Sequence, residues 1–217
     1  MTLQTMLGML FQGYGTTLEI FAITLVLGVP LGIPIALGRL SRFKPLSLLM
    51  QLIISLLRGT PLMLQMFAVA FVPYYVFGIS MGSGYTFVAV CIAFVINYAA
   101  YFAEIYRSGI QSIPRGQYEA AQVLGYSSRQ TFFRIVLPQV IKRILPAMGN
   151  EVVTLVKDTS LAFSLGVLEL FSQSRSIVNS QRDMVGFALA ALFYWVTCLV
   201  IEFILRKLEK KLDYYHD

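Results

Sequence analysis

Charged and amide side chains lie inside the long apolar runs of this sequence, where such groups are costly to bury. They are Arg58, Asn97, Glu104, Glu151 and Asp158. An ionisable group at the centre of a membrane costs about 3 kcal/mol, so one found there is a candidate functional group. Carboxylates, an amide and a guanidinium can bind a small solute that carries charges and hydrogen-bonding groups. The expected chemistry is therefore recognition of a polar solute.

Helical spacing collects polar side chains into two stripes. The first has the spacing i, i+4, i+7 and i+11, and consists of Asn97, Tyr101, Glu104 and Ser108. The second has the spacing i, i+3 and i+7, and consists of Glu151, Thr154 and Asp158. Residues with these spacings share one face of a helix. Two such faces on neighbouring helices would line a water-filled path.

The same groups could instead satisfy one another. Arg58 could pair with Glu151, and Lys157 could pair with Asp158. For Glu151 and Asn97, solute contact and internal pairing fit the sequence equally well. For Arg58, Lys157 and Asp158, pairing or capping is favoured. Glu104 could pair with a basic residue one helical turn away, at position 107.

The sequence shows no set of catalytic or metal-binding residues near these groups. Cys91 and Cys198 lie in apolar runs, where they are typical of small buried hydrophobes, and His216 is the single histidine. The sequence contains neither the G-x-x-x-x-G-K-[ST] motif of a P-loop nor a G-x-S-x-G motif. We therefore expect a non-catalytic chain without a metal site.

Composition indicates the elements that carry the stripes. Of 217 residues, 57% are hydrophobic and 13% are charged, whereas a soluble domain has about 25% charged residues. Since a span needs roughly 20 apolar residues, the sequence predicts an all-α membrane protein with one domain, 1–217. The expected spans are residues 16–37, 46–71, 85–106, 140–156 and 184–205.

Basic residues predict the orientation of these spans. Most of them follow the first span, lie between the third and fourth, or follow the fifth: Arg39, Arg42, Lys44, Arg107, Arg115, Arg129, Arg134, Lys142, Arg143, Arg206, Lys207, Lys210 and Lys211. The positive-inside rule places these segments in the cytoplasm and the N-terminus outside. Counted from the cytoplasmic ends, Arg58 and Glu151 lie about 18 Å and Asn97 about 15 Å into their spans, near mid-membrane.

Local signals also predict breaks in the helices. Pro61 cannot donate to the carbonyl of Leu57, so we expect the second span to loosen at Arg58-Gly59-Thr60-Pro61. After the fourth span, Asp158-Thr159-Ser160 could cap a new helix over residues 161–174 at the outer surface.

The segment 112–138 is polar, but it carries start and stop signals for defined structure. Pro114 suits a helix start, and Gly125 can end that helix with a positive φ. Ser127 and Gln130 then have the spacing of a capping box, and Pro138 is expected to stop this second helix before the fourth span. Two short, rigid helices with a sharp bend would suit a docking surface better than a mere linker.

This segment resembles the EAA loop of ABC importer permeases. The matching positions are Glu119, Ala120, Ala121, Gly125, Ile135, Leu137 and Pro138. The segments Arg58-Gly59-Thr60-Pro61 and Lys157-Asp158-Thr159-Ser160-Leu161 resemble those of polar amino acid permeases, the histidine, arginine, lysine and glutamine uptake group. The resemblance covers nearly the whole chain and implies a type I ABC importer permease fold.

The resemblance implies specific partners. The EAA loop would couple the permease to a cytoplasmic ABC ATPase present in two copies, and ATP and Mg²⁺ would bind there, with no cofactor on this chain. A second permease subunit would complete a homodimer or a heterodimer in the bacterial inner membrane. An extracellular or periplasmic binding protein would deliver the amino acid.

The resemblance also implies that the solute bound by the two polar stripes is an amino acid. The carboxylate of an amino acid would bind an arginine or the N–H groups of a helix start, as at Arg58 and Thr60 or at Thr159 and Ser160. Its cationic end would bind Glu151 or the rings of Tyr98 and Tyr101. Acidic groups in the spans favour a basic or polar amino acid. The alternative is a stand-alone secondary transporter or channel for a small polar solute, against which the five spans and the EAA loop argue.

Overall fold

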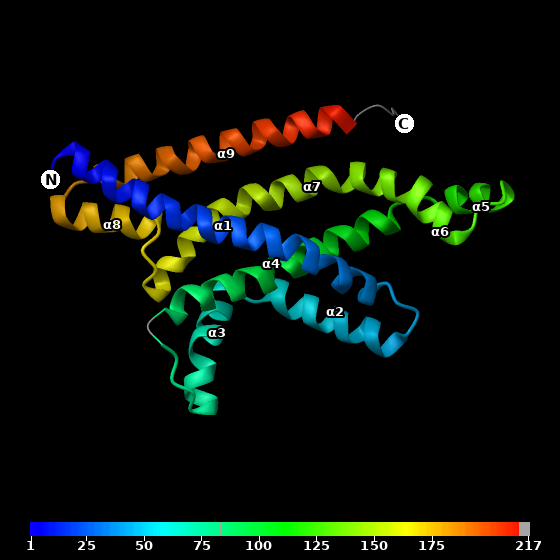
Figure 1. Cartoon of the computed structure of the whole chain (residues 1–217), viewed down its shortest axis with the longest axis horizontal. Helices are drawn as coiled ribbons and strands as arrows, with labels where there is room; N and C mark the ends of the chain where they lie inside the picture. The colour runs from blue at the N-terminus through cyan, green and yellow to red at the C-terminus, as the bar shows by residue number, and fades with distance from the viewer. Residues whose placement is uncertain (83, 213–217) are drawn as a thin grey trace.

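The computed structural model describes residues 1–82 and 84–212, so His216 lies outside the described part of the chain. The described residues are almost entirely helical (Figure 1). In chain order the helices are α1 (Leu3–Arg39), α2 (Lys44–Gly59), α3 (Leu62–Phe77), α4 (Tyr85–Gln111), α5 (Arg115–Val123), α6 (Ser128–Thr131), the π-helix η1 (Phe132–Val136), α7 (Leu137–Asp158), the 3-10 helix η2 (Thr159–Leu165), α8 (Leu170–Gln181) and α9 (Val185–Leu212). The predicted all-α membrane fold is confirmed.

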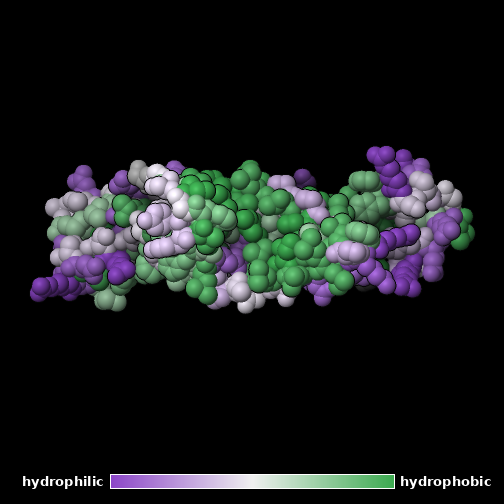
Figure 2. All heavy atoms as spheres, turned by 90° about the horizontal axis from the view of Figure 1, so that it is seen from below, coloured by the Kyte–Doolittle hydropathy of each residue, from purple (hydrophilic) through white to green (hydrophobic). Residues whose placement is uncertain are grey.

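Long apolar helices form the body of the molecule. Helices α1, α4 and α9 are each long and apolar enough to cross a membrane, and α2 with α3 would do so as one bent pair. Figure 2 shows hydrophobic residues over the middle of the viewed face and hydrophilic residues at both ends. Helix α7 has 22 residues and is about 33 Å long, but Lys142, Arg143 and Glu151 make it less apolar than α1, α4 and α9. Its membrane span, residues 140–156, stays a prediction.

Small residues bring α1 and α4 close together. A Cβ atom on Gly32 would lie 2.9 Å from the Cβ of Phe102 and 3.1 Å from the carbonyl oxygen of Ala99. Ala99, Ala100 and Ala103 of α4 are fully buried. Close packing of this kind is typical of small residues in membrane helices, and it fixes the position of α4, which carries the first polar stripe.

The predicted break in the second span is complete. Helix α2 ends at Gly59, and α3 begins after Pro61 at an angle of 107° to it. Pro61 has no N–H to donate to the carbonyl of Leu57. This carbonyl instead accepts hydrogen bonds from the side-chain amides of Gln65 at 2.7 Å and Asn97 at 3.0 Å. Tertiary contacts therefore satisfy the backbone group that proline leaves without its helical donor.

The helix predicted over residues 161–174 is wrong. Asp158 has helical backbone angles, φ −65° and ψ −24°, so α7 continues directly into η2 without a new start. The chain turns at Gly166, which has φ 77°, and α8 begins only after Glu169. The side chain of Asp158 bonds to a neighbouring helix instead of capping, as described below, and that tertiary contact removes the basis of the predicted cap.

The stop predicted at Pro138 is also wrong, because the helix continues from α6 through η1 into α7. A proline normally deprives the carbonyl four residues earlier of its donor and clashes with it. Here a turn of π-helix over Phe132–Val136 precedes the proline. We attribute the continuity to this wider turn, which makes i→i+5 hydrogen bonds.

Candidate functional site

Helices α5 and α6 form a hairpin at one end of the bundle, residues 115–131, hereafter the α5–α6 hairpin (Figure 1). Gly125 has φ 78°, and its N–H donates to the carbonyl of Gln122 at 3.0 Å. The N–H of Tyr126 donates to the carbonyl of Ala121, also at 3.0 Å. These two bonds form a Schellman motif. The predicted role of Gly125 as a helix terminator is confirmed.

A capping box starts the second arm of the hairpin. The N–H of Ser127 donates to Oε1 of Gln130 at 2.9 Å, and the N–H of Gln130 donates to Oγ of Ser127 at 3.3 Å. Both helix ends at the bend therefore have their backbone groups satisfied within the hairpin. A turn held in this way is stiff and can keep one shape while it is exposed.

The hairpin presents apolar side chains to its surroundings. Val123 is 88% exposed and Leu124 is 73% exposed. Of the matched EAA positions, Glu119 and Ala120 are exposed, whereas Ala121 is buried. Ile135 and Leu137 are half-buried and Pro138 is exposed, where η1 joins α7. Exposed large apolar side chains grouped at one tip are typical of an interaction surface.

A basic hollow lies beside this bend. It has a volume of about 420 Å³ and is lined by Ser127, Arg129, Gln130, Phe133 and Arg134. The guanidinium of Arg129 lies 5.9 Å from the ring centre of Phe133. The hairpin therefore has an apolar tip, and a positively charged hollow lies where its second arm continues into η1.

The polar stripes lie on α4 and α7, which pack against each other. The hydroxyl of Tyr98 donates to Oδ2 of Asp158 at 2.7 Å and so joins the two helices. Glu151 is half-buried, and Thr154 is exposed. The α4 stripe and the α7 stripe therefore lie on neighbouring helices.

Arg58 lies beside the α4 stripe. Its guanidinium is 5.0 Å from the ring centre of Tyr101. Among the ion pairs of the described residues, none joins Arg58 to Glu151 or Lys157 to Asp158, so both suggested pairings are wrong.

Glu104 forms an internal pair. Both of its carboxylate oxygens accept hydrogen bonds from Arg107, one of them from Nε at 2.9 Å. The pairing across one helical turn that the sequence suggests is therefore confirmed.

The side chain of Asn97 forms hydrogen bonds at the break between α2 and α3. Its Nδ2 donates to the carbonyl of Leu57 and to Oε1 of Gln65, both at 3.0 Å, and the residue is only 4% exposed. This geometry favours a structural role for Asn97. Gln65 was not predicted from the sequence. The one signal for it is the carbonyl of Leu57, which lacks a donor because of Pro61 and therefore needs a nearby amide.

Two of the predicted hydroxyl groups bond within their own turns. Thr159 is buried and donates to the carbonyl of Val156 at 2.6 Å, and Ser160 donates to the carbonyl of Lys157 at 2.8 Å. Because η2 continues α7, the predicted anion site at the start of a helix at Thr159 is wrong. Thr60 donates to the carbonyl of Leu56 at 2.8 Å, and α3 does begin there, after Pro61.

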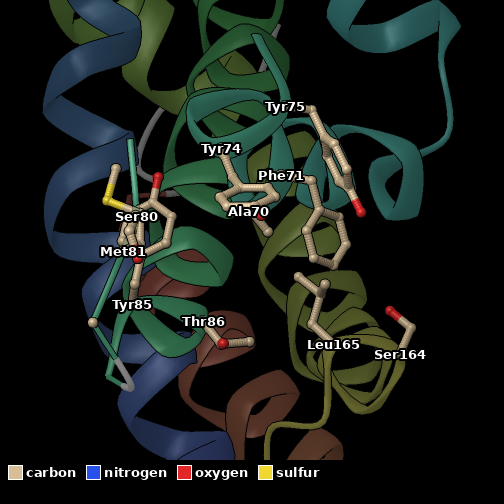
Figure 3. Close-up of a pocket in the computed structure, with 11 residues that line it drawn as sticks. Ala70, Phe71, Tyr74, Tyr75, Ser80, Met81, Tyr85, Thr86, Ser164 and Leu165 are labelled. Atoms are coloured by element: carbon tan, nitrogen blue, oxygen red, sulfur yellow. The ribbon is translucent and has the colours of Figure 1, made fainter. Parts of the chain in front are cut away.

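A second hollow, which the sequence analysis missed, opens between α3, the start of α4 and η2. It has a volume of about 490 Å³, and its lining includes Phe71, Tyr74, Tyr75, Tyr85 and Ser164. Figure 3 shows the aromatic side chains of α3 on one side and Ser164 and Leu165 of η2 on the other.

Glu169 is a buried carboxyl group beyond the end of η2. It is fully buried and accepts hydrogen bonds from the N–H groups of Phe171 and Ser172, both at 2.7 Å. The hydroxyl of Tyr194 donates to it at 3.3 Å. Burial raises the pKa of this carboxyl to about 7, although these three donors act in the opposite direction.

Comparison with known proteins agrees with this arrangement. The chain is 33% identical over 201 residues to the L-cystine transport system permease protein TcyB of Bacillus subtilis strain 168, covering 92% of this chain and 84% of that protein. It is 32% identical over 204 residues to the arginine transport system permease protein ArtQ of the same organism, covering 94% and 92%.

A solved structure has the same fold. It is described as an amino acid ABC transporter with histidines, and it matches with a TM-score of 0.86 and 31% identity over 97% of this chain and 99% of that chain. The family model described as "Binding-protein-dependent transport system inner membrane component" matches residues 28–214. The chain therefore belongs to this family and is a non-catalytic permease subunit of an ABC importer.

Proposed function

We propose that the chain is the permease subunit of an ATP-driven importer of polar amino acids, with a preference for basic ones. The α5–α6 hairpin would dock a cytoplasmic ABC ATPase, and the polar groups of α4 and α7 would line the solute path. The observation that carries the proposal is an exposed, internally capped hairpin at the end of the helices that bear those groups. Relatives described as cystine and arginine permeases support an amino acid solute.

The hairpin has properties suited to transmitting a movement. Its bend is closed by four hydrogen bonds around Gly125 and Ser127. Leu124 and Val123 offer apolar contact area, and Arg129 and Arg134 would favour an acidic partner surface. Glu119, Ala120 and Ala121 lie on α5, and Ile135, Leu137 and Pro138 lie where the hairpin joins α7. A stiff element passes on a push that a flexible loop would absorb.

The mid-span groups would recognise the two ends of an amino acid. Arg58 and the start of α3 at Thr60 suit a carboxylate. Glu151, with the ring of Tyr101, suits an ammonium or guanidinium group. Tyr98 is only 2% exposed and donates to Asp158, so these two residues would support the solute-binding groups without touching the solute.

The assembly follows from the same family. We propose a second permease subunit, either a copy of this chain or a related one, because Arg58 is exposed on the isolated chain at a depth where lipid would be unfavourable. The complex would contain two ATPase subunits and receive its solute from an extracellular or periplasmic binding protein. The N-terminus would lie outside the bacterial inner membrane, with the C-terminus and the hairpin in the cytoplasm.

Uptake by the whole complex tests the solute. Membrane vesicles that hold the complete complex and its binding protein would be supplied with radiolabelled arginine, glutamine or cystine. ATP-dependent accumulation of arginine above the other two is expected. Equal uptake of all three would contradict the basic preference, and uptake without ATP would contradict an ATP-driven importer.

Capture of the ATPase subunit tests the hairpin. Leu124→Asp should abolish co-purification of the ATPase, because it places a charge on an apolar docking surface. Leu168→Asp is a matched control, since Leu168 is 61% exposed and lies just before α8, a helix that Figure 1 shows toward the opposite end of the molecule from the hairpin. Retention of the ATPase by Leu124→Asp would contradict docking through this tip.

A further inference from the structure

The α5–α6 hairpin is joined to the bundle by two stems, the end of α4 and the start of α7. An apolar cluster fills the space between them: Ile113, Val136 and Val140 are at most 5% exposed, and Ile110, Phe132 and Ile144 pack around them. This stem cluster contains residues from both sides of the hairpin. The two stems are thus held together where they leave the bundle.

Gly109 sets how closely the stems approach. It is buried on α4, and a Cβ atom there would lie 2.2 Å from Cγ2 of Ile144 and 3.3 Å from Cγ1 of Val140. Any side chain at position 109 would therefore force α4 and α7 apart. A β-branched isoleucine in a helix has little freedom to turn away.

A polar contact closes the same junction on its exposed side. Nη1 of Arg143 on α7 donates to the carbonyl oxygen of Ser112 at 2.5 Å and to its Oγ at 3.3 Å. Ser112 is the C-cap of α4, and its Oγ donates to the carbonyl of Gly109 at 2.7 Å. The last turn of α4 is thereby tied to α7 by a cation as well as by the apolar cluster.

We propose that this junction is a clamp that makes α4 and α7 move as one body with the hairpin, and that Gly109 and Arg143 are its positioning residues. The two helices also meet further along, where Tyr98 donates to Asp158. A displacement of the hairpin therefore reaches both polar stripes together. This inference rests on the proposed coupling of the hairpin to an ATPase, and it names the residues that carry the movement into the membrane.

The test uses the complete complex with its ATPase and binding protein. Gly109→Ala should leave the ATPase subunit bound but lower the ratio of solute-stimulated to basal ATP hydrolysis about tenfold, as a loss of roughly 1.4 kcal/mol of coupling would. Ile144→Ala removes the Cγ2 atom that the new methyl group meets. The double variant Gly109→Ala/Ile144→Ala should therefore recover most of the ratio. Gly8→Ala is the matched control, because nothing lies within 4 Å of a Cβ atom there.

A second variant keeps the test decisive if Gly109→Ala fails to fold. Arg143 is exposed, so Arg143→Ala should assemble normally and lower the same ratio about threefold, whereas Arg206→Ala at the end of α9 should not change it. An unchanged ratio in Arg143→Ala, or an uncoupled Gly109→Ala that Ile144→Ala does not rescue, would overturn the clamp. Failure of the wild-type chain to retain the ATPase would overturn the proposed function itself, and the clamp with it.

Discussion

The hydroxyl of Tyr98 lies 2.7 Å from Oδ2 of Asp158 and donates a hydrogen bond to it. Tyr98 is at the middle of α4 and only 2% exposed, and Asp158 is the last residue of α7. One bond thus connects the two helices that carry the polar stripes. Asp158 is half-buried, and a hydrogen-bond donor such as Tyr98 offsets the cost of removing its carboxyl group from water.

Removing this bond should loosen the contact between α4 and α7. Tyr98→Phe leaves the ring in place and takes away only the donor, so we expect a loss of about 1–2 kcal/mol in stability. Thermal unfolding of the purified subunit in detergent measures this. Tyr75→Phe is the control, since Tyr75 is 78% exposed, and equal melting temperatures for the two variants would contradict the structural role of the bond.

Glu151 should distinguish solutes by charge. Glu151→Gln keeps the size of the side chain and removes its charge, so uptake of arginine should fall about tenfold, the effect of losing one favourable charge contact, while uptake of glutamine changes little. Competition uptake assays in vesicles with the whole complex measure both. Glu202→Gln on α9 is the matched control, because its side chain is 42% exposed and pairs with Arg206. An equal loss for both solutes would assign Glu151 a structural role.

Gly125 should be essential for coupling and dispensable for folding of the bundle. Gly125→Val meets no atom within 4 Å, but it forces a β-branched residue to adopt φ 78°, at a cost of about 1–2 kcal/mol. The bend of the hairpin should open and solute-stimulated ATP hydrolysis should be lost, with insertion into the membrane unchanged. Gly8→Val on α1 provides the comparison. Normal stimulation in Gly125→Val would remove the bend from the coupling mechanism.

Glu169 should make stability depend on pH. Its pKa is raised from 4.5 to about 7 by burial, so the folded protein holds a proton that the unfolded chain releases. The contribution of the protonated carboxyl is therefore fully present below about pH 4.5 and is lost as the pH rises through 7. The melting temperature of the wild-type subunit should fall between pH 5 and pH 7.5. In Glu169→Gln, which cannot ionise, that decrease should be smaller, and identical decreases would show that other groups cause it.

The α5–α6 hairpin could be predicted because its signals are local. Gly125, Ser127 and Gln130 bond to backbone groups within five residues of themselves, so the positive φ and the capping box follow from the sequence alone. The break at Pro61 is equally local, since proline lacks a donor wherever it occurs. The spaced pattern of the EAA loop is local too, and it indicates the family through Glu119, Ala120, Ala121, Gly125, Ile135, Leu137 and Pro138.

The partners of the polar side chains could not be predicted in this way. The sequence shows that the carbonyl of Leu57 lacks its helical donor, but only the packing of α4 brings Asn97 to it. Asp158 was expected to cap a helix, yet Tyr98, distant in sequence, bonds to it because α4 and α7 cross there. The sequence alone therefore determined an apolar helical chain with a defined break and a capped hairpin, since backbone geometry and hydrophobic burial act over a few residues. The tertiary structure decided which buried polar groups meet, because that depends on helix crossings set by close contacts such as those at Gly32 and Gly109.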